Sequence, residues 1–128
     1  MPEQNTDARR IMLVVAGCLI PGLALQAVLI DPTGVLRNVL TAGVVALATD
    51  RLCLRLRNPE GLQGKATIRP QPTVSDASAL VTGLILAAAL PPGAVSAVAL
   101  ATLTALALGK HAYGGLGNNV FNPAMVGY

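Results

Sequence analysis

A run of 33 residues without a charged side chain, Ala77–Gly109, is the feature that most constrains how this chain can fold. The hydrocarbon core of a bilayer is about 30 Å thick, and a helix needs about 20 apolar residues to cross it. Soluble domains carry about 25% charged residues, whereas this chain carries 12% and is 53% hydrophobic. Too little polar surface remains to cover a water-soluble globule. We therefore predict an all-α, polytopic transmembrane helical protein.

Turn-forming residues divide the apolar sequence into about four predicted spans. Pro91-Pro92-Gly93 splits the uncharged run, and because proline interrupts a helix we predict a helical hairpin with its tip there. Asp31–Gly34 is a predicted tight turn, and Arg55–Thr73 is a predicted loop. The spans are Ile11–Ile30, Val35–Leu54, Ala77–Leu90 and Ala94–Ala112, in one transmembrane domain of residues 1–128 that ends at the start of a fifth span. Met1–Arg10, which is polar, is predicted to be mobile.

The distribution of basic residues predicts the orientation of these spans. Arg9 and Arg10 precede the first span, and the loop Arg55–Thr73 is rich in Arg and Lys. Lys110 follows the uncharged run. Under the positive-inside rule the N-terminus, this loop and the C-terminal tail are cytoplasmic. The tip at Pro91–Gly93 then lies on the outer side.

Several polar residues have predicted local roles. Gln26, the one polar side chain in its span, is expected to form a hydrogen bond between helices. Ser75 and Asp76 are expected to cap the third span, with an ion ligand as the alternative for Asp76. Cys18 and Cys53 lie in apolar segments without metal-ligand spacing and are predicted to be buried free thiols.

Asp50 is the candidate for an ion path, because an ionisable residue within a span is costly and often functional. Two interpretations remain open: a carboxylate near the uptake point of an ion, or an interfacial residue paired with a neighbouring arginine such as Arg51. His111 could titrate near neutral pH, or it could be a solvated residue beside Lys110. No catalytic residue or metal site is predicted, because His111 has no second histidine or nearby cysteine. No basic stripe interleaved with aromatic residues indicates nucleic-acid binding.

A glycine- and asparagine-rich segment, Gly114–Pro123, follows the fourth span. Glycine permits close backbone approach, and asparagine amides both donate and accept hydrogen bonds. Irregular backbone at membrane depth is tolerated where it lines a cavity or is buried in protein. The segment is either the wall of a ligand or cofactor site or a turn into a fifth span that begins at Pro123, capped by Asn122. The candidate cofactor-binding residues are Gly114, Gly115, Asn118, Asn119, Phe121 and Asn122.

Three stretches carry a resemblance to a known family: Ser75–Leu86, Leu90-Pro91-Pro92 and Tyr113–Tyr128. They resemble the D subunit of the Rnf electron-transport complex, with the B subunit of the sodium-pumping NADH:quinone reductase (Nqr) as the related alternative. The similarity extends over nearly the whole chain. His111, where the Nqr branch has an acidic residue, and Tyr113, where it has Phe, favour the Rnf branch.

The resemblance implies a multi-pass protein of the bacterial inner membrane that works with the other membrane subunits of its complex. Such complexes couple flavin-mediated electron transfer, between ferredoxin and NAD or from NADH to quinone, to Na⁺ or H⁺ translocation. The implied cofactor of the full-length protein is FMN, with riboflavin as a further candidate. The family attaches FMN to a threonine in a Ser-x-Ala-Thr motif, which does not occur in this sequence. The chain is therefore expected to be the N-terminal portion of such a protein and to be inactive alone.

Two other functions remain open from the residues. The short hairpin and the Gly114–Pro123 segment also suit a small-solute or ion transporter or channel, since broken helices often form binding sites near the bilayer midplane. The small residues of the third span, Gly83 and Ala87-Ala88-Ala89, suit a structural membrane protein without a redox centre.

Overall fold

The computed structural model describes residues 2–57, 74–112 and 121–128, and these form helices without any strand. The helices are α1 (Pro2–Leu29), α2 (Pro32–Arg57), α3 (Val74–Ala89), α4 (Val95–Thr104), the π-helix η2 (Ala105–His111) and α5 (Pro123–Gly127). The all-α prediction is therefore correct for the described residues.

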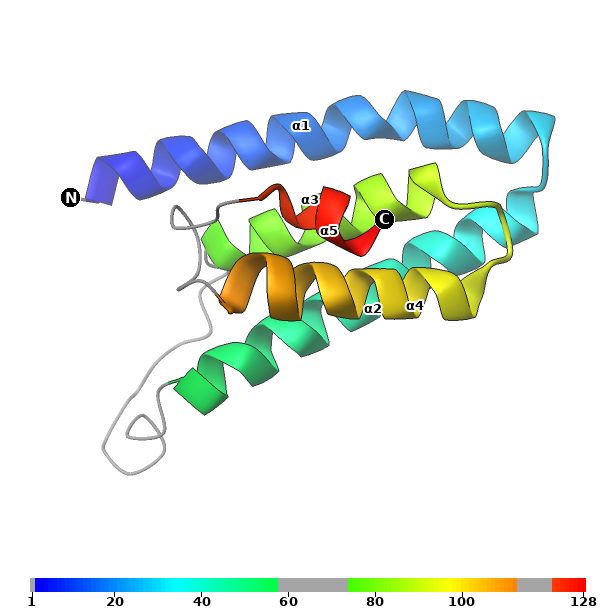
Figure 1. Cartoon of the computed structure of the whole chain (residues 1–128). Helices are drawn as coiled ribbons and strands as arrows, with labels where there is room; N and C mark the ends of the chain where they lie inside the picture. Colours follow the sequence, from blue (N-terminus) through cyan, green and yellow to red (C-terminus); the bar gives the residue numbers. More distant parts are fainter. Residues whose placement is uncertain (1, 58–73, 113–120) are drawn as a thin grey trace.

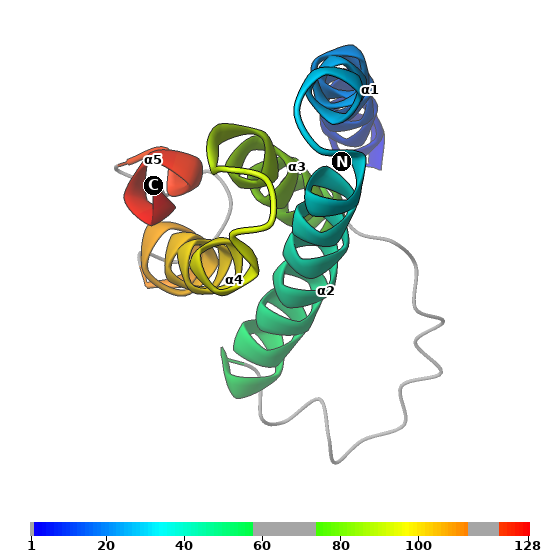
Figure 2. The same cartoon turned by 90° about the vertical axis from the view of Figure 1, so that its right-hand side faces the viewer.

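Helices α1, α2, α3 and α4 alternate in direction, and η2 continues α4 without a break (Figure 1). The start of α1, the end of α2 and the end of η2 lie at one end of the bundle, on the left in Figure 1, and the α3–α4 connection lies at the other. Viewed along the bundle, α3 lies in the centre with α1, α2, α4 and α5 around it (Figure 2), and it packs on each of them. A short, strongly apolar helix therefore forms the middle of the assembly.

Three predicted boundaries are wrong in informative ways. The polar N-terminus is helical, since α1 begins at Pro2 and continues through Pro21. The predicted turn at Asp31–Gly34 is shorter, because α2 begins at Pro32. Asp31 precedes it as a cap: the Asp31 carboxylate accepts from the Thr33 amide at 3.0 Å, and Pro32 lacks the amide that would otherwise be left unpaired. Ser75 and Asp76 lie inside the first turn of α3, which begins at Val74.

By length and composition, one described helix is long and apolar enough to cross a membrane, Thr6–Leu29 within α1. Two other apolar helices, Ala77–Ala89 and Val95–His111, are shorter. Only 6% of the apolar window of Thr6–Leu29 is buried in the protein. Large apolar side chains such as Ile11, Ile20 and Val28 are consequently more than 60% exposed along α1.

The connection between α3 and α4 is fixed onto α2 by one buried side chain. Gly93 has a φ of 84°, which L-residues with a side chain rarely adopt, and it closes the turn between the two helices. The Asn38 amide, fully buried on α2, donates to the Pro91 carbonyl at 2.9 Å. Gly34 lets this turn approach α2, because a Cβ there would lie within 2.9 Å of the backbone at Pro92 and Gly93.

Interhelical packing relies on small side chains. A Cβ at Gly83 of α3 would lie 3.1 Å from the Ala42 carbonyl oxygen of α2. Ala42 packs with Ala87 and Val98, and Ala46 packs with Ala79 and Leu106.

Two further predictions concern polar side chains in these helices. Gln26 donates to the Ala88 carbonyl at 3.5 Å, which confirms the predicted bond between helices. Cys18 is exposed, contrary to the prediction, because it lies on the outward side of α1, whereas Cys53 is half-buried. Both are free thiols, as predicted.

We expect Gly83→Leu to separate α2 from α3, because the added side chain has no space beside the Ala42 backbone. Overpacking of this kind typically costs about 1–3 kcal/mol. Gly43→Leu on α2 is the matched control, since nothing lies within 4 Å of a Cβ there. Unfolding in mixed detergent micelles measures both, and equal loss of stability in the two variants would contradict the packing described.

Candidate functional site

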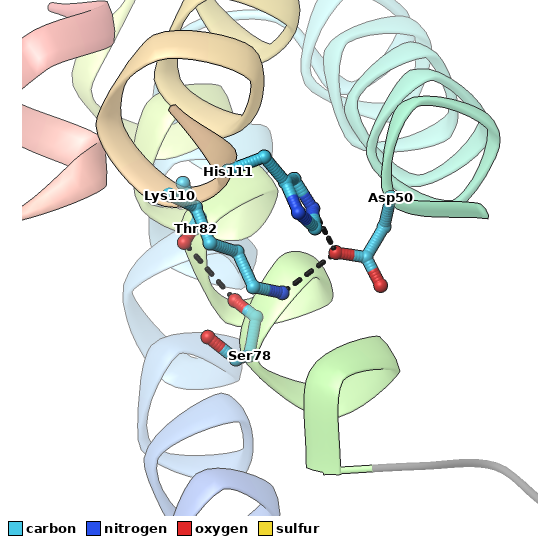
Figure 3. Close-up of polar contacts among 5 residues, drawn as sticks. All are labelled: Asp50, Ser78, Thr82, Lys110 and His111. Carbon is cyan, nitrogen blue, oxygen red and sulfur yellow. Dashed lines mark hydrogen bonds and ion pairs between the residues drawn. The ribbon is translucent and has the colours of Figure 1, made fainter. Parts of the chain in front are cut away.

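Three ionisable side chains from two elements meet inside the bundle: Asp50 of α2 with Lys110 and His111 of η2 (Figure 3). We call this group the Asp50 cluster. Lys110 Nζ lies 2.7 Å from Asp50 Oδ1, and His111 Nε2 lies 2.8 Å from the same oxygen. The side chains of Asp50 and Lys110 are 0% exposed, and that of His111 is 7% exposed.

The structure places two predicted residues in this interior rather than at the surface. Asp50 is fully buried, and its contacts with Lys110 and His111 join positions 60 and 61 residues apart. The neighbouring Arg51 is exposed. His111 is not a solvated residue, because its side chain is nearly enclosed and bound to Asp50. A role for Asp50 in an ion path stays a prediction.

The π-helical geometry of η2 brings two consecutive residues to the same acceptor. Adjacent side chains on an α-helix diverge, whereas the wider turn of a π-helix, closed by a hydrogen bond from residue i to residue i+5, places them closer in direction. The Ala112 amide donates to the Ala107 carbonyl at 3.0 Å in this pattern. Lys110 and His111 both reach Oδ1 of Asp50 from this segment. Single π-helical turns are rare in proteins, and those that occur are often found at functional sites.

Apolar packing lies on both sides of the cluster. Ala46, one turn before Asp50, and Leu106, one turn before Lys110, pack with Ala79 of α3. On the other side of η2, a Cβ at Gly109 would lie 2.8 Å from the Cα of the first residue of α5, so α5 approaches the backbone next to Lys110.

The hydroxyl of Thr82 lies on α3 close to the cluster in Figure 3. It donates to its own helix, to the Ser78 carbonyl at 3.0 Å. This hydroxyl therefore does not donate to Asp50.

The hydrogen bonding of the cluster defines one tautomer of the neutral histidine. A carboxylate oxygen only accepts hydrogen bonds, so Nε2 of His111 donates to Asp50. In the neutral ring Nδ1 then carries the lone pair. Among the described residues, Nδ1 is buried and has no hydrogen-bond partner.

Most of the predicted cofactor-binding segment lies outside the described residues: Gly114, Gly115, Asn118 and Asn119. Phe121 is described and is 60% exposed. Asn122 caps α5, with its side-chain oxygen accepting from the Ala124 amide at 3.0 Å and Pro123 in the first turn, as predicted. Asn122 also lines an apolar cavity of about 260 Å³ between α3 and α5, with Leu86 and Met125.

Lys110 is the member of the cluster that sequence reasoning misses, because the sequence places it at the flank of a span. The one available signal is its position four residues after Leu106, within an otherwise uncharged helix. Its partner Asp50 lies too far away in sequence for any local pattern to join them.

We expect Lys110→Met to destabilise the bundle strongly, because it removes the ammonium that lies 2.7 Å from a fully buried carboxylate. Removing one member of a buried ion pair typically costs about 3–5 kcal/mol. The exposed arginine next to Asp50 provides the control, Arg51→Met, which should change the free energy of unfolding by less than about 0.5 kcal/mol.

A double variant separates a lost pair from lost packing. Adding Asp50→Leu to Lys110→Met removes both charges and should recover part of the stability, since apolar replacement of a whole buried pair is often neutral. If the stability lost in the double variant equals the sum of the losses in Asp50→Leu and Lys110→Met, the two side chains do not interact.

Comparison with known proteins gives a match over nearly the whole sequence. Residues 2–128 match the model of the NQR2, RnfD, RnfE family. The chain is 48% identical over 120 residues to the D subunit of the ion-translocating oxidoreductase complex of Pseudomonas aeruginosa (strain LESB58), covering 92% of this chain and 32% of that protein. It is 44% identical over 127 residues to the protein of the same name from Escherichia coli O7:K1 (strain IAI39 / ExPEC), covering 98% of this chain and 33% of the relative. The chain thus spans about a third of the length of the curated relatives it matches.

Proposed function

The chain belongs to the NQR2, RnfD, RnfE family, and from this premise we propose that it forms the N-terminal membrane portion of the D subunit of an ion-translocating oxidoreductase complex. The observation that carries the proposal is the identity of 44–48% over nearly the whole chain to proteins of that name. In the complex, electron transfer between ferredoxin and NAD would be coupled to translocation of Na⁺ or H⁺. The partners would be the other membrane subunits, in a bacterial inner membrane.

The apolar exterior supports placement in a bilayer. In water, the exposed apolar side chains of α1 would be unfavourable. In lipid they are solvated, and the close contacts at small residues such as Gly83 then supply the packing between helices. We propose four spans, formed by α1, α2, α3 and α4 continued by η2, with the turn at Pro91–Gly93 as the tip of a hairpin.

The charge distribution supports an orientation in which the Asp50 cluster lies toward the cytoplasm. The starts of α1 and α3 and the ends of α2 and η2 share one end of the bundle (Figure 1). Arg51 and Arg55 are exposed on α2 near that end, and the positive-inside rule assigns such residues to the cytoplasmic side. The α3–α4 turn would face outward.

The residues of this chain do not fit a covalently bound FMN. The Ser-x-Ala-Thr motif is absent from the sequence, and the side-chain oxygen of Asn122 is used as a helix cap. We therefore propose that FMN belongs to the remainder of a full-length D subunit and assign no redox step to the residues described.

Cysteine labelling tests the orientation. With Cys18 and Cys53 replaced by alanine, Ser96→Cys near the α3–α4 turn should react with a membrane-impermeant maleimide in intact spheroplasts. Arg55→Cys should react only after the membrane is permeabilised. Both native side chains are exposed, so accessibility within the protein is matched. Labelling of Arg55→Cys from outside would reverse the proposed topology.

Affinity purification tests the function. When the chain is expressed with the rest of a D subunit in cells that make the complex, a tag on the chain should recover the other membrane subunits and flavin fluorescence. Vesicles from these cells should accumulate cations when supplied with reduced ferredoxin and NAD, and vesicles lacking the chain should not. Recovery of the chain without these subunits, from cells whose vesicles keep full activity, would exclude the proposed role. Solute flux without bound flavin would favour a transporter instead.

A further inference from the structure

The Asp50 cluster contains an open proton acceptor, and we propose that Nδ1 of His111 is a proton-binding site of this membrane domain. The proposal rests on the function proposed above, and names the proton as the ion that this site would take. The site consists of the His111 imidazole, with Asp50 as the residue that orients it and Lys110 as the cation that neutralises Asp50.

The hydrogen bonds of the cluster leave one atom available. Asp50 Oδ1 accepts from Lys110 Nζ at 2.7 Å and from His111 Nε2 at 2.8 Å. This fixes the neutral ring with its proton on Nε2 and its lone pair on Nδ1. Nδ1 has no hydrogen-bond partner in the part of the chain that the structure describes. Asn38 Oδ1 and Thr102 Oγ1 are also buried without a partner, but of the three atoms only Nδ1 of the imidazole binds a proton near neutral pH.

Binding of one proton changes the net charge of the cluster by one unit, and release of the proton reverses the change. The Lys110 ammonium and the Asp50 carboxylate sum to zero, so the cluster is neutral when His111 is neutral. Binding of H⁺ to the Nδ1 lone pair forms an imidazolium and raises the charge of the cluster to +1. Asp50, 2.8 Å away, stabilises that charge, whereas Lys110 opposes it. Loss of the same N–H bond returns the proton and restores the neutral ring.

Among the residues that the structure describes, the elements around the cluster carry few other ionisable side chains. The elements that pack on η2 are α2, α3, α4 and α5. Helices α4 and α5 carry no ionisable side chain, and α3 carries Asp76, whose side chain lies outside the described ones. On α2, Arg51 and Arg55 are exposed, and Cys53 is a half-buried free thiol.

His111 lies nearer the protein surface than the other two members of the cluster, although its Nδ1 atom is buried. It is the one member of the cluster with exposed side-chain surface, 7% against 0% for Asp50 and Lys110. It also ends η2, at the end of the bundle where α2 ends (Figure 1). A sodium ion at Oδ1 would have to displace the Lys110 ammonium, whereas a proton at Nδ1 displaces nothing.

Nitrogen NMR of the histidine ring tests the proposal. The complex containing the full D subunit is labelled with ¹⁵N-histidine in liposomes, and the signals lost in His111→Gln assign His111. We expect one neutral tautomer, protonated at Nε2, that converts reversibly to the imidazolium when the sample is acidified. A ring that stays neutral, stays charged, or has its proton on Nδ1 at every pH at which the complex remains folded would overturn the proposal. A change with Na⁺ at constant pH would also overturn it.

Two matched carboxylate variants test the role of Asp50. In Asp50→Asn the fraction of His111 in the imidazolium form under the same conditions should fall, because the negative charge that stabilises the imidazolium is gone. Asp31→Asn makes the same change at the opposite end, where asparagine still caps α2, and should leave this fraction unchanged. Equal fractions in the wild type and Asp50→Asn would remove Asp50 from the site. Because the readout is the ring nitrogen, it is separate from partner recovery and redox activity, so failure of this proposal is distinguishable from failure of the proposed function.

Discussion

The ion pair between Asp50 and Lys110 is the interaction on which the charged end of the bundle depends. Both side chains are fully buried, and each requires the other, because an unpaired charge in a dry interior costs several kcal/mol. The pair can form only if η2 lies against α2, and η2 also packs on α3 and α5. The position of one carboxylate therefore constrains the arrangement of four elements.

The opposite end of the bundle is held by a different kind of contact. There a neutral amide, Asn38, binds the Pro91 carbonyl, and Gly34 allows the α3–α4 turn to approach α2. Neutral hydrogen bonds do not change with the protonation of a neighbour. The two ends of α2 thus differ in physical character: one end is fixed by geometry alone, and the other carries groups whose charge can change.

Features that depend on neighbouring residues could be predicted from the sequence. Contacts between residues far apart in the sequence could not. The helical class, the break at Pro91–Gly93, the Asn122 cap and the bond from Gln26 all follow from short patterns of apolar, proline and amide residues. The environment of Asp50 did not follow, although one clue was present. Adjacent residues on an α-helix do not face the same way, so an exposed Arg51 was a poor partner for an inward-facing Asp50.

The π-helical segment η2 explains why the joint contact of Lys110 and His111 with Asp50 could not be predicted from the sequence. Helical periodicity directs Lys110 and His111 to different faces, whereas in the π-helical segment both reach the same carboxylate oxygen. A wider turn is less favourable than an α-helix and persists where tertiary contacts compensate. Here the compensation comes from two charge-assisted hydrogen bonds to Asp50 and from the close approach of α5 at Gly109. The charge state of the cluster and the geometry of η2 are therefore coupled, because weakening either bond to Asp50 removes part of what holds the π-helical turn.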